Sequence, residues 1–297
     1  MSPARAASVV LTAAHGLTLG VDQKTVDPAP FLKVRKTRKY MGTQDDMAVV
    51  CVGHALAEAK LSLLAPAEGG VDPDRLGLYA AIGFIPFERA DIAPVLAASL
   101  TRGAFDVRRF SEEGFVKAHP LLTFRCLPNM PVYHVSANFG ITGPYMVTYP
   151  GEGQAFLALE EARVALVDGS IDAAVVFATA HQRNFLVEHH HARLDHPVDA
   201  SLLRDSACAL ILEREDDARA RGVRPKARLA ELDVSYEPTD LLENEPLPTS
   251  TSTSTSTGAP APFIELLAHL SSLPLSQHRS TRDGLTARAI WSPAEDQ

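Results

Sequence analysis

Residues 135–180 decide the fold, and their sequence is VSANFGITGPYMVTYPGEGQAFLALEEARVALVDGSIDAAVVFATA. Residues 146–148 are strand formers, and Pro150-Gly151 breaks the chain after them. Residues 156–166 then carry Phe, Leu, Ala and Leu at helical spacing. The apolar run of residues 173–178 does not alternate with polar residues, which is typical of a strand covered on both faces. The stretch therefore predicts a short strand, a tight turn, a long helix and a buried strand.

This order of features resembles the β-ketoacyl synthases of the thiolase superfamily. In that family a Gly-Pro and a short strand precede a nucleophilic cysteine at a sharp turn, which opens a buried helix, and Gly-Asp-x-Asp precedes a Val/Ala-rich strand. Gly143-Pro144, the helix from Gly153 and the Gly169-Ser170-Ile171-Asp172 segment fall at matching spacing. The position of the cysteine is occupied by Glu152. The resemblance covers residues 8–234.

The substitution at Glu152 matters because of what a helix N-terminus does. Its unpaired N–H groups and partial positive charge favour a thiolate and supply donors for an oxyanion. A carboxylate is tolerated there as an anion but is a poor nucleophile toward an acyl thioester. The three cysteines of the chain lie elsewhere, and we expect each to pack as a small apolar group: Cys51 in a helix, Cys126 in a loop and Cys208 in a strand.

The resemblance also implies a second set of missing residues. A complete subunit of the family repeats the strand and helix layout, and its second copy supplies catalytic histidines. After Val234 the sequence has no His-Gly-Thr-Gly-Thr-like stretch and no Asn-Ala-His near a glycine-rich loop, and His269 and His278 have different surroundings. The loss of the nucleophile and both histidines predicts a subunit that does not condense.

The predicted architecture is an α/β thiolase-like layered fold that corresponds to the N-terminal half of the family. We expect a mixed, mostly parallel five-stranded sheet with helices on both faces and the helix from Gly153 buried. The predicted domains are a ketosynthase-like domain over residues 1–237 and a flexible linker over 238–262, which is rich in Thr, Ser and Pro. Residues 263–297 are predicted to form a helix and a strand that pack back on the domain.

Composition excludes several classes of protein. The net charge of the 297 residues is −8, which argues against broad nucleic-acid binding. The sequence has no run of about 18 apolar residues, which a membrane span would need. The apolar stretch near its N-terminus is too short for a signal peptide. Three scattered cysteines do not make a disulfide framework, so we expect a cytoplasmic protein. No cofactor is expected.

Histidines gather between residues 181 and 196, and three of them are consecutive at 189–191. Consecutive side chains on a helix point in different directions, so few of them could share a metal ion. We predict no metal site and instead a surface or interface loop near the pocket.

The candidate site residues form three groups. Glu152, in the nucleophile position, is the candidate catalytic residue. The basic stretch before residue 40 has two interpretations: a solvated face, or a docking patch for an acidic acyl carrier protein or a partner subunit. The docking candidates are Lys33, Arg35, Lys36, Arg38 and Lys39. The candidates for substrate contact or a subunit interface are Phe124, Arg125, Met130, Phe139, Tyr145, Thr148, Gly151, Gly153 and Gln154.

Three functions remain open at this point. The first is a non-condensing subunit similar to the chain-length factors of type II polyketide and aryl-polyene synthesis, which pair with a ketosynthase. The second is an enzyme in which Glu152 assists decarboxylation or hydrolysis of a thioester, since some relatives carry Gln there and decarboxylate. The third is a scaffold without pocket function. An uncovered apolar face usually marks an interface, so we expect either a homodimer or a pair with a ketosynthase.

Overall fold

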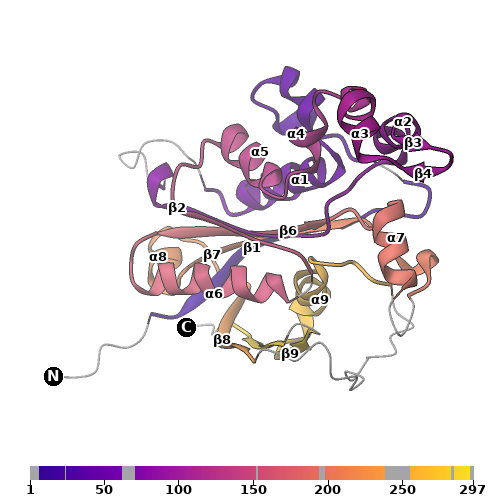
Figure 1. The fold of residues 1–297 in the computed structure, drawn as a ribbon. Coiled ribbons are helices and arrows are strands. Elements are labelled where there is room, and N and C mark those ends of the chain that lie inside the picture. Colours follow the sequence, from indigo (N-terminus) through magenta and orange to yellow (C-terminus); the bar gives the residue numbers. More distant parts are fainter. Residues whose placement is uncertain are drawn as a thin grey trace.

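An eight-stranded sheet forms the centre of the molecule (Figure 1). The structure is a computed structural model, and it describes residues 7–23, 25–61, 71–151, 153–193, 198–237, 255–281 and 284–294. The strands, in their order across the sheet, are β5 (Tyr145–Thr148), β2 (Leu76–Ile82), β6 (Ala173–Ala180), β7 (Ser206–Arg214), β1 (Val9–Thr18), β8 (Ala227–Tyr236), β10 (Leu285–Ser292) and β9 (Leu275–Ser280).

The sheet is mixed and mostly antiparallel, so the predicted five-stranded, mostly parallel sheet is wrong. Among the described residues, two pairs of neighbouring strands are parallel, β2 with β5 and β2 with β6. The other neighbouring strands run antiparallel. A continuous apolar strand indicates that both of its faces are covered, but it does not fix the direction of the strand beside it.

Two layers of helices cover the sheet, as predicted. On one face lie α1 (Thr43–Glu58) and α5 (Met130–Phe139), with α4 (Leu122–Cys126) beside them (Figure 1). On the other face lie α6 (Gln154–Val167), α8 (Glu215–Ala220) and α9 (Ala261–His269). The central strand β6 shows why both layers are needed: Val175 and Phe177 pack in the core on the α1 side, and Val176 and Ala178 in the core on the α6 side.

Helix α6 lies inside a bend of the sheet. It contacts β2, β6 and β5 on one side, and it also contacts β8 and β10 from the far part of the sheet. Its core-facing residues include Phe156, Leu159 and Leu166, which are almost fully buried. Val164 and Val167 remain about half exposed. The helix is therefore buried along the predicted stripe but keeps one open side.

A helical segment joins β2 to α5 over residues 89–126. It contains α2 (Arg89–Ala98), the small hairpin of β3 (Leu100–Thr101) and β4 (Ala104–Phe105), α3 (Val107–Arg109), η5 (Phe110–Gly114), η6 (Phe115–Lys117) and α4. Residues 110–117 and 122–126 are therefore helical turns. The next helix, α5, carries Pro131 in its first turn, where no backbone N–H is required.

The last part of the chain belongs to the same layered body. Ser256 forms a bridge with Leu203, and its backbone N–H donates to the Leu202 carbonyl. The described end of the predicted linker, from residue 255, is therefore held against β7 and leads directly into α9. The hairpin of β9 and β10 adds two strands where the sequence predicted one. The remaining elements are α7 (Phe185–Ala192) and short 3-10 turns at η1 (Ala29–Phe31), η2 (Arg35–Tyr40), η4 (Pro73–Arg75), η7 (Ala200–Leu202) and η8 (Leu270–Ser272).

Within the described ranges, none of the helices has the length and apolar character needed to cross a membrane.

Candidate functional site

The turn between β5 and α6 is the centre of the predicted site. Gly151 has a φ of 108°, a backbone conformation that favours glycine. Its carbonyl accepts a hydrogen bond from Gln154 N at 3.3 Å. The hydroxyl of Thr148 lies 2.9 Å from the Gln154 carbonyl and 3.2 Å from the Ala80 carbonyl. Thr148 therefore fixes the end of β5 to the first turn of α6. Glu152, the candidate catalytic residue, lies outside the described residues.

Gly153 is in close contact with the C-terminal hairpin. A Cβ atom built on it would lie 2.3 Å from Leu285 Cδ2 and 2.8 Å from Thr281 Cγ2. Thr281 follows β9 in the connection between the two strands, and Leu285 is the first residue of β10. A side chain at position 153 would have to displace these two side chains, and the hairpin covers the start of α6.

A small cavity, the Gly151 cavity, opens beside this turn. Its volume is about 170 Å³. It is formed where β2 and β6 end, by the loop and helix after β6, and by the segment that enters α9. Its lining residues are Gly83, Phe84, Gly151, Ala180, His181, Gln182, Val187, His191, Ser256, Gly258 and Ala259.

His191 is the titratable group of this cavity whose nitrogens have no assigned partner. Both ring nitrogens are buried, and neither has a hydrogen-bond partner among the described residues. Burial, and then the neighbouring His190, lower the pKa of His191 below its usual value. The ring is therefore neutral near pH 7, when it can both donate and accept a proton.

His181 lies at the end of β6 in a buried ionic cluster. Its Nε2 is 3.1 Å from Glu88 Oε1 and its Nδ1 is 3.2 Å from Asp205 Oδ1. Burial lowers the pKa of His181, but the two carboxylates outweigh burial and raise it to about 9. The sequence predicts for residues 181–196 only a surface or interface loop, with no role for His181. The pairing of Ala180 with Ser206 in the sheet explains the contact, because it sets the next residues outward, His181 and Asp205, side by side.

His181 also lines a second cavity, the Asp46 cavity. This cavity has a volume of about 180 Å³ and lies between the start of α1, the segment after β2 and the end of α4. Arg125 and Cys126 line it, and Arg125 Nη2 is 2.9 Å from Asp91 Oδ1.

The structure does not bring all the predicted site residues together. Of the nine substrate or interface candidates, Gly151 lines the Gly151 cavity, and Thr148, Gly153 and Gln154 build the turn beside it. Arg125 lines the Asp46 cavity instead.

The remaining four candidates are spread over α4, α5 and the sheet edge. Phe124 packs against Tyr40, with ring centroids 5.6 Å apart. Met130 and Phe139 stand at the two ends of α5, and Phe139 contacts Phe31. Tyr145 is 69% exposed on β5, which is one of the two edge strands of the sheet.

The basic segment forms the 3-10 turn η2 and its approach. Lys33, Arg35, Lys36 and Lys39 are exposed. Arg38 differs from them, because its Nη2 lies 2.6 Å from Asp46 Oδ2 and its side chain lines the Asp46 cavity. Four of the five docking candidates are thus on the surface.

The three cysteines are buried, as predicted. Burial raises the pKa of the Cys51 and Cys208 thiols well above the usual range, and that of Cys126 to about 11. Cys126 lies at the end of α4 rather than in a loop. A thiol with a raised pKa is a poor nucleophile near pH 7, so none of the three replaces a cysteine at the turn. Among the described residues, no group of three His, Cys, Asp or Glu side chains could hold a metal ion.

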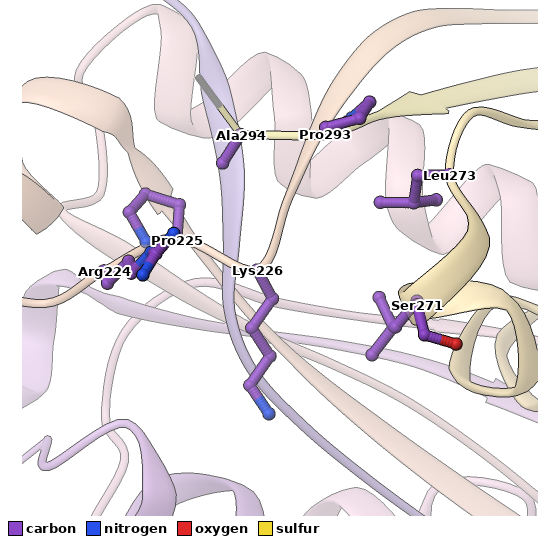
Figure 2. Close-up of a pocket in the computed structure, with 8 residues that line it drawn as sticks. Arg224, Pro225, Lys226, Ser271, Leu273, Pro293 and Ala294 are labelled. Carbon is purple, nitrogen blue, oxygen red and sulfur yellow. The ribbon is translucent and has the colours of Figure 1, made fainter. Parts of the chain in front are cut away.

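A more open cavity of about 610 Å³ lies at the start of β8 (Figure 2). Arg224, Pro225 and Lys226 form one wall, and residues of η8 and the end of β10 form the others. The Lys226 ammonium is 2.5 Å from Glu58 Oε1. None of the predicted site residues lines this cavity.

No model of a protein family matches the chain, and no curated protein matches it. Solved structures do match. A chain of the AntDE:AntF structure, a type II polyketide synthase acyl-carrier protein in complex with its ketosynthase, has a TM-score of 0.72 at 15% identity. A β-ketoacyl synthase from Burkholderia phymatum STM815 has a TM-score of 0.72 at 13% identity. The ishigamide ketosynthase/chain length factor has a TM-score of 0.62 at 14% identity. The chain has a thiolase-like α/β fold.

These matches extend beyond the N-terminal half of the family that the sequence predicted. Each covers 97% of this chain and 100% of the other chain. The likeness therefore continues past Val234, where the resemblance in sequence ends, and it is not limited to the N-terminal part of the matched chains.

Proposed function

We propose that this chain is a ketosynthase-like subunit that does not condense. In this proposal it pairs with a ketosynthase, as a chain-length factor does, in type II polyketide, aryl-polyene or fatty-acid-like biosynthesis. The observation that carries the proposal is the turn at Gly151 and Gly153, which stands at the start of α6 with Glu152 in place of a cysteine. The buried cysteines support it, because none of them offers a thiolate to this turn.

The edge of the sheet supports the proposed pairing. Strand β5 has β2 on one side, and on its other side no strand of the described residues is paired with it. Tyr145 on this strand and Tyr133 on the neighbouring α5 are both more than half exposed. An open strand edge beside exposed aromatic side chains is suited to a partner subunit. The exposed lysines and arginine of the basic segment are suited to an acidic carrier protein.

The first experiment measures the mass of the native species by light scattering on a size-exclusion column. The chain is prepared alone and co-expressed with a ketosynthase of the same organism. A heterodimer that forms on co-expression is expected, and the products of that heterodimer are then analysed for chain length. The chain alone, supplied with acyl and malonyl thioesters of a carrier protein, is expected to give no condensation product. Condensation by the chain alone would overturn the proposal, and so would failure to assemble with any ketosynthase offered.

A second candidate function is favoured by His191. A neutral histidine with two unpartnered nitrogens, in the cavity that Gly151 lines, is suited to proton transfer in thioester chemistry. The corresponding reaction is decarboxylation, in which a malonyl thioester loses CO₂ and takes up a proton to give the acetyl thioester.

The test of this second function uses Glu152→Gln and His191→Gln, with His189→Gln on the exposed side of α7 as the matched control. Loss of CO₂ release in the first two variants, with turnover kept in the control, would favour decarboxylation. Absence of turnover in the wild-type chain would exclude decarboxylation and leave the subunit role as the proposed function.

A further inference from the structure

Helix α7 covers one side of the Gly151 cavity. Val187 and His191 both line the cavity, and a spacing of four residues places them on the same face of the helix. All eight residues of α7 are described, and Val187 alone among them is buried. Figure 1 shows α7 beyond the end of the sheet, apart from the helices that cover its two faces. Val187 is therefore the buried anchor of a helix that is otherwise at the surface.

The start of α7 is fixed to the body of the molecule. The Asn184 side chain accepts hydrogen bonds from Leu186 N and Val187 N. Its amide group donates to the His181 carbonyl at the end of β6, at 2.8 Å. Asn184 is only 4% exposed, so these hydrogen bonds are shielded from water. This end of the helix can serve as a hinge that keeps its place while the other end moves.

The far end of α7 is held by weaker contacts. The His190 ring lies against Phe84, another residue that lines the cavity, with ring centroids 4.8 Å apart. The His191 carbonyl accepts a hydrogen bond from Val198 N at 3.3 Å, which is long for a bond of this kind. An outward movement of this end breaks these two contacts and draws His191, and then Val187, away from the cavity.

Three consecutive histidines occupy the last turn of α7, and a proton on His191 is unfavourable while the helix is in place. The rings of His190 and His191 have centroids 5.5 Å apart, and His181, already protonated, lines the same cavity. The other described residues of the lining, from the ends of β2 and β6, the turn after β5 and the segment that enters α9, are uncharged. Glu188 and Arg193, on and just after the helix, are exposed to water. Burial, and then His190, lower the pKa of His191.

We propose that α7 is a pH-sensitive lid on the Gly151 cavity, closed while His191 is neutral and opened at its far end when His191 takes up a proton. In the open position water solvates the imidazolium, so protonation and opening favour each other. The closed lid is therefore favoured above the ordinary pKa of histidine, near 6.5, and the open lid gains as the pH falls below it. Neither proposed function is needed for this, because the lid controls access to the cavity and not the chemistry inside it.

The experiment measures how readily a thiol at the buried anchor reacts. Val187→Cys is treated with N-ethylmaleimide at several pH values from about 5.5 to about 8, and mass spectrometry locates the label. Ala192→Cys, at the exposed end of the same helix, is the reference, because division by its rate removes the pH dependence of the thiolate itself. We expect the relative rate at position 187 to be several-fold higher at the lowest pH than at the highest. A relative rate that does not change with pH overturns the proposal.

Histidine variants separate the switch from a general loosening of the helix. In the Val187→Cys background, His191→Gln keeps a polar side chain that cannot take up a proton, so the pH dependence is expected to vanish. His189→Gln, on the exposed side of α7, is the matched control and is expected to keep it. A pH dependence that survives His191→Gln, or that disappears in the control, overturns the proposal.

Hydrogen exchange of the wild-type chain decides if these variants fail to fold by circular dichroism. Opening of the lid frees the Val198 amide from the His191 carbonyl. Its exchange, corrected for the intrinsic effect of pH, is expected to be several-fold faster at the lowest pH than at the highest. Equal protection at both pH values overturns the proposal.

Discussion

At the scale of single residues, the ionic cluster around His181 makes stability depend on pH. The folded pKa of His181, about 9, lies above the ordinary value of 6.5, so the folded state holds this proton more tightly than the unfolded state. The stabilisation is therefore fully present below pH 6.5 and is lost as the pH rises toward 9. We expect the wild-type chain to lose about 3 kcal/mol more than His181→Gln over that window.

Urea denaturation at several pH values from 6 to 9 measures this difference. Subtracting the stability of the variant at each pH removes the contribution of the other titrating groups. Parallel stability curves for the two proteins would show that the carboxylates of Glu88 and Asp205 do not hold the proton. The contact between His181 and Asp205 could not be predicted from the sequence. His181 and Asp205 are 24 positions apart, and only the register of β6 against β7 brings them into contact.

At the scale of elements, the start of α6 depends on the hairpin of β9 and β10. Gly153→Ala places a methyl group against Leu285 Cδ2 and Thr281 Cγ2, and we expect this overpacking to cost about 1–3 kcal/mol. The backbone of Gly153 has a φ of −61°, which alanine adopts without strain, so the cost comes from contact alone.

A double-mutant cycle with Leu285→Ala tests this assignment by chemical denaturation. Leu285→Ala alone is expected to cost about 2–5 kcal/mol, because the residue is buried. In its background, Gly153→Ala is expected to cost much less than in the wild-type chain. Equal costs in both backgrounds would mean that the hairpin does not press on α6.

The elements of residues 135–180 could be predicted because their signals are local. A strand, a glycine turn, an amphipathic helix and a buried strand each follow from a few neighbouring residues, and β5, α6 and β6 lie where they were expected. The number and direction of the strands could not be predicted in this way. They depend on pairings between distant segments, such as β1 with β7 and β8 with β10, which no short pattern encodes. The contact of Gly153 with Leu285 could not be predicted either, because it also joins distant segments of the chain.

At the scale of the whole molecule, the two ends of the sheet differ in what they offer to a partner. Strand β9 closes the far end next to β10, and β10 contacts α6. Strand β5 closes the other end, and it continues directly into the turn at Gly151. A partner that pairs with β5 would therefore lie close to the candidate site, whereas a partner on β9 would meet the back of the hairpin.

Tyr145→Lys tests which end is used. Tyr145 is 69% exposed at the start of β5, and a lysine on an edge strand opposes pairing with another strand. We expect the variant to keep its stability within about 0.5 kcal/mol and to lose most of its dimer, whether with itself or with a ketosynthase, in light scattering. Tyr236→Lys is the matched control, because Tyr236 is 60% exposed at the end of β8, away from β5. If both variants assemble like the wild-type chain, the β5 edge is not the interface, and if only Tyr236→Lys dissociates, the partner sits on the opposite part of the sheet.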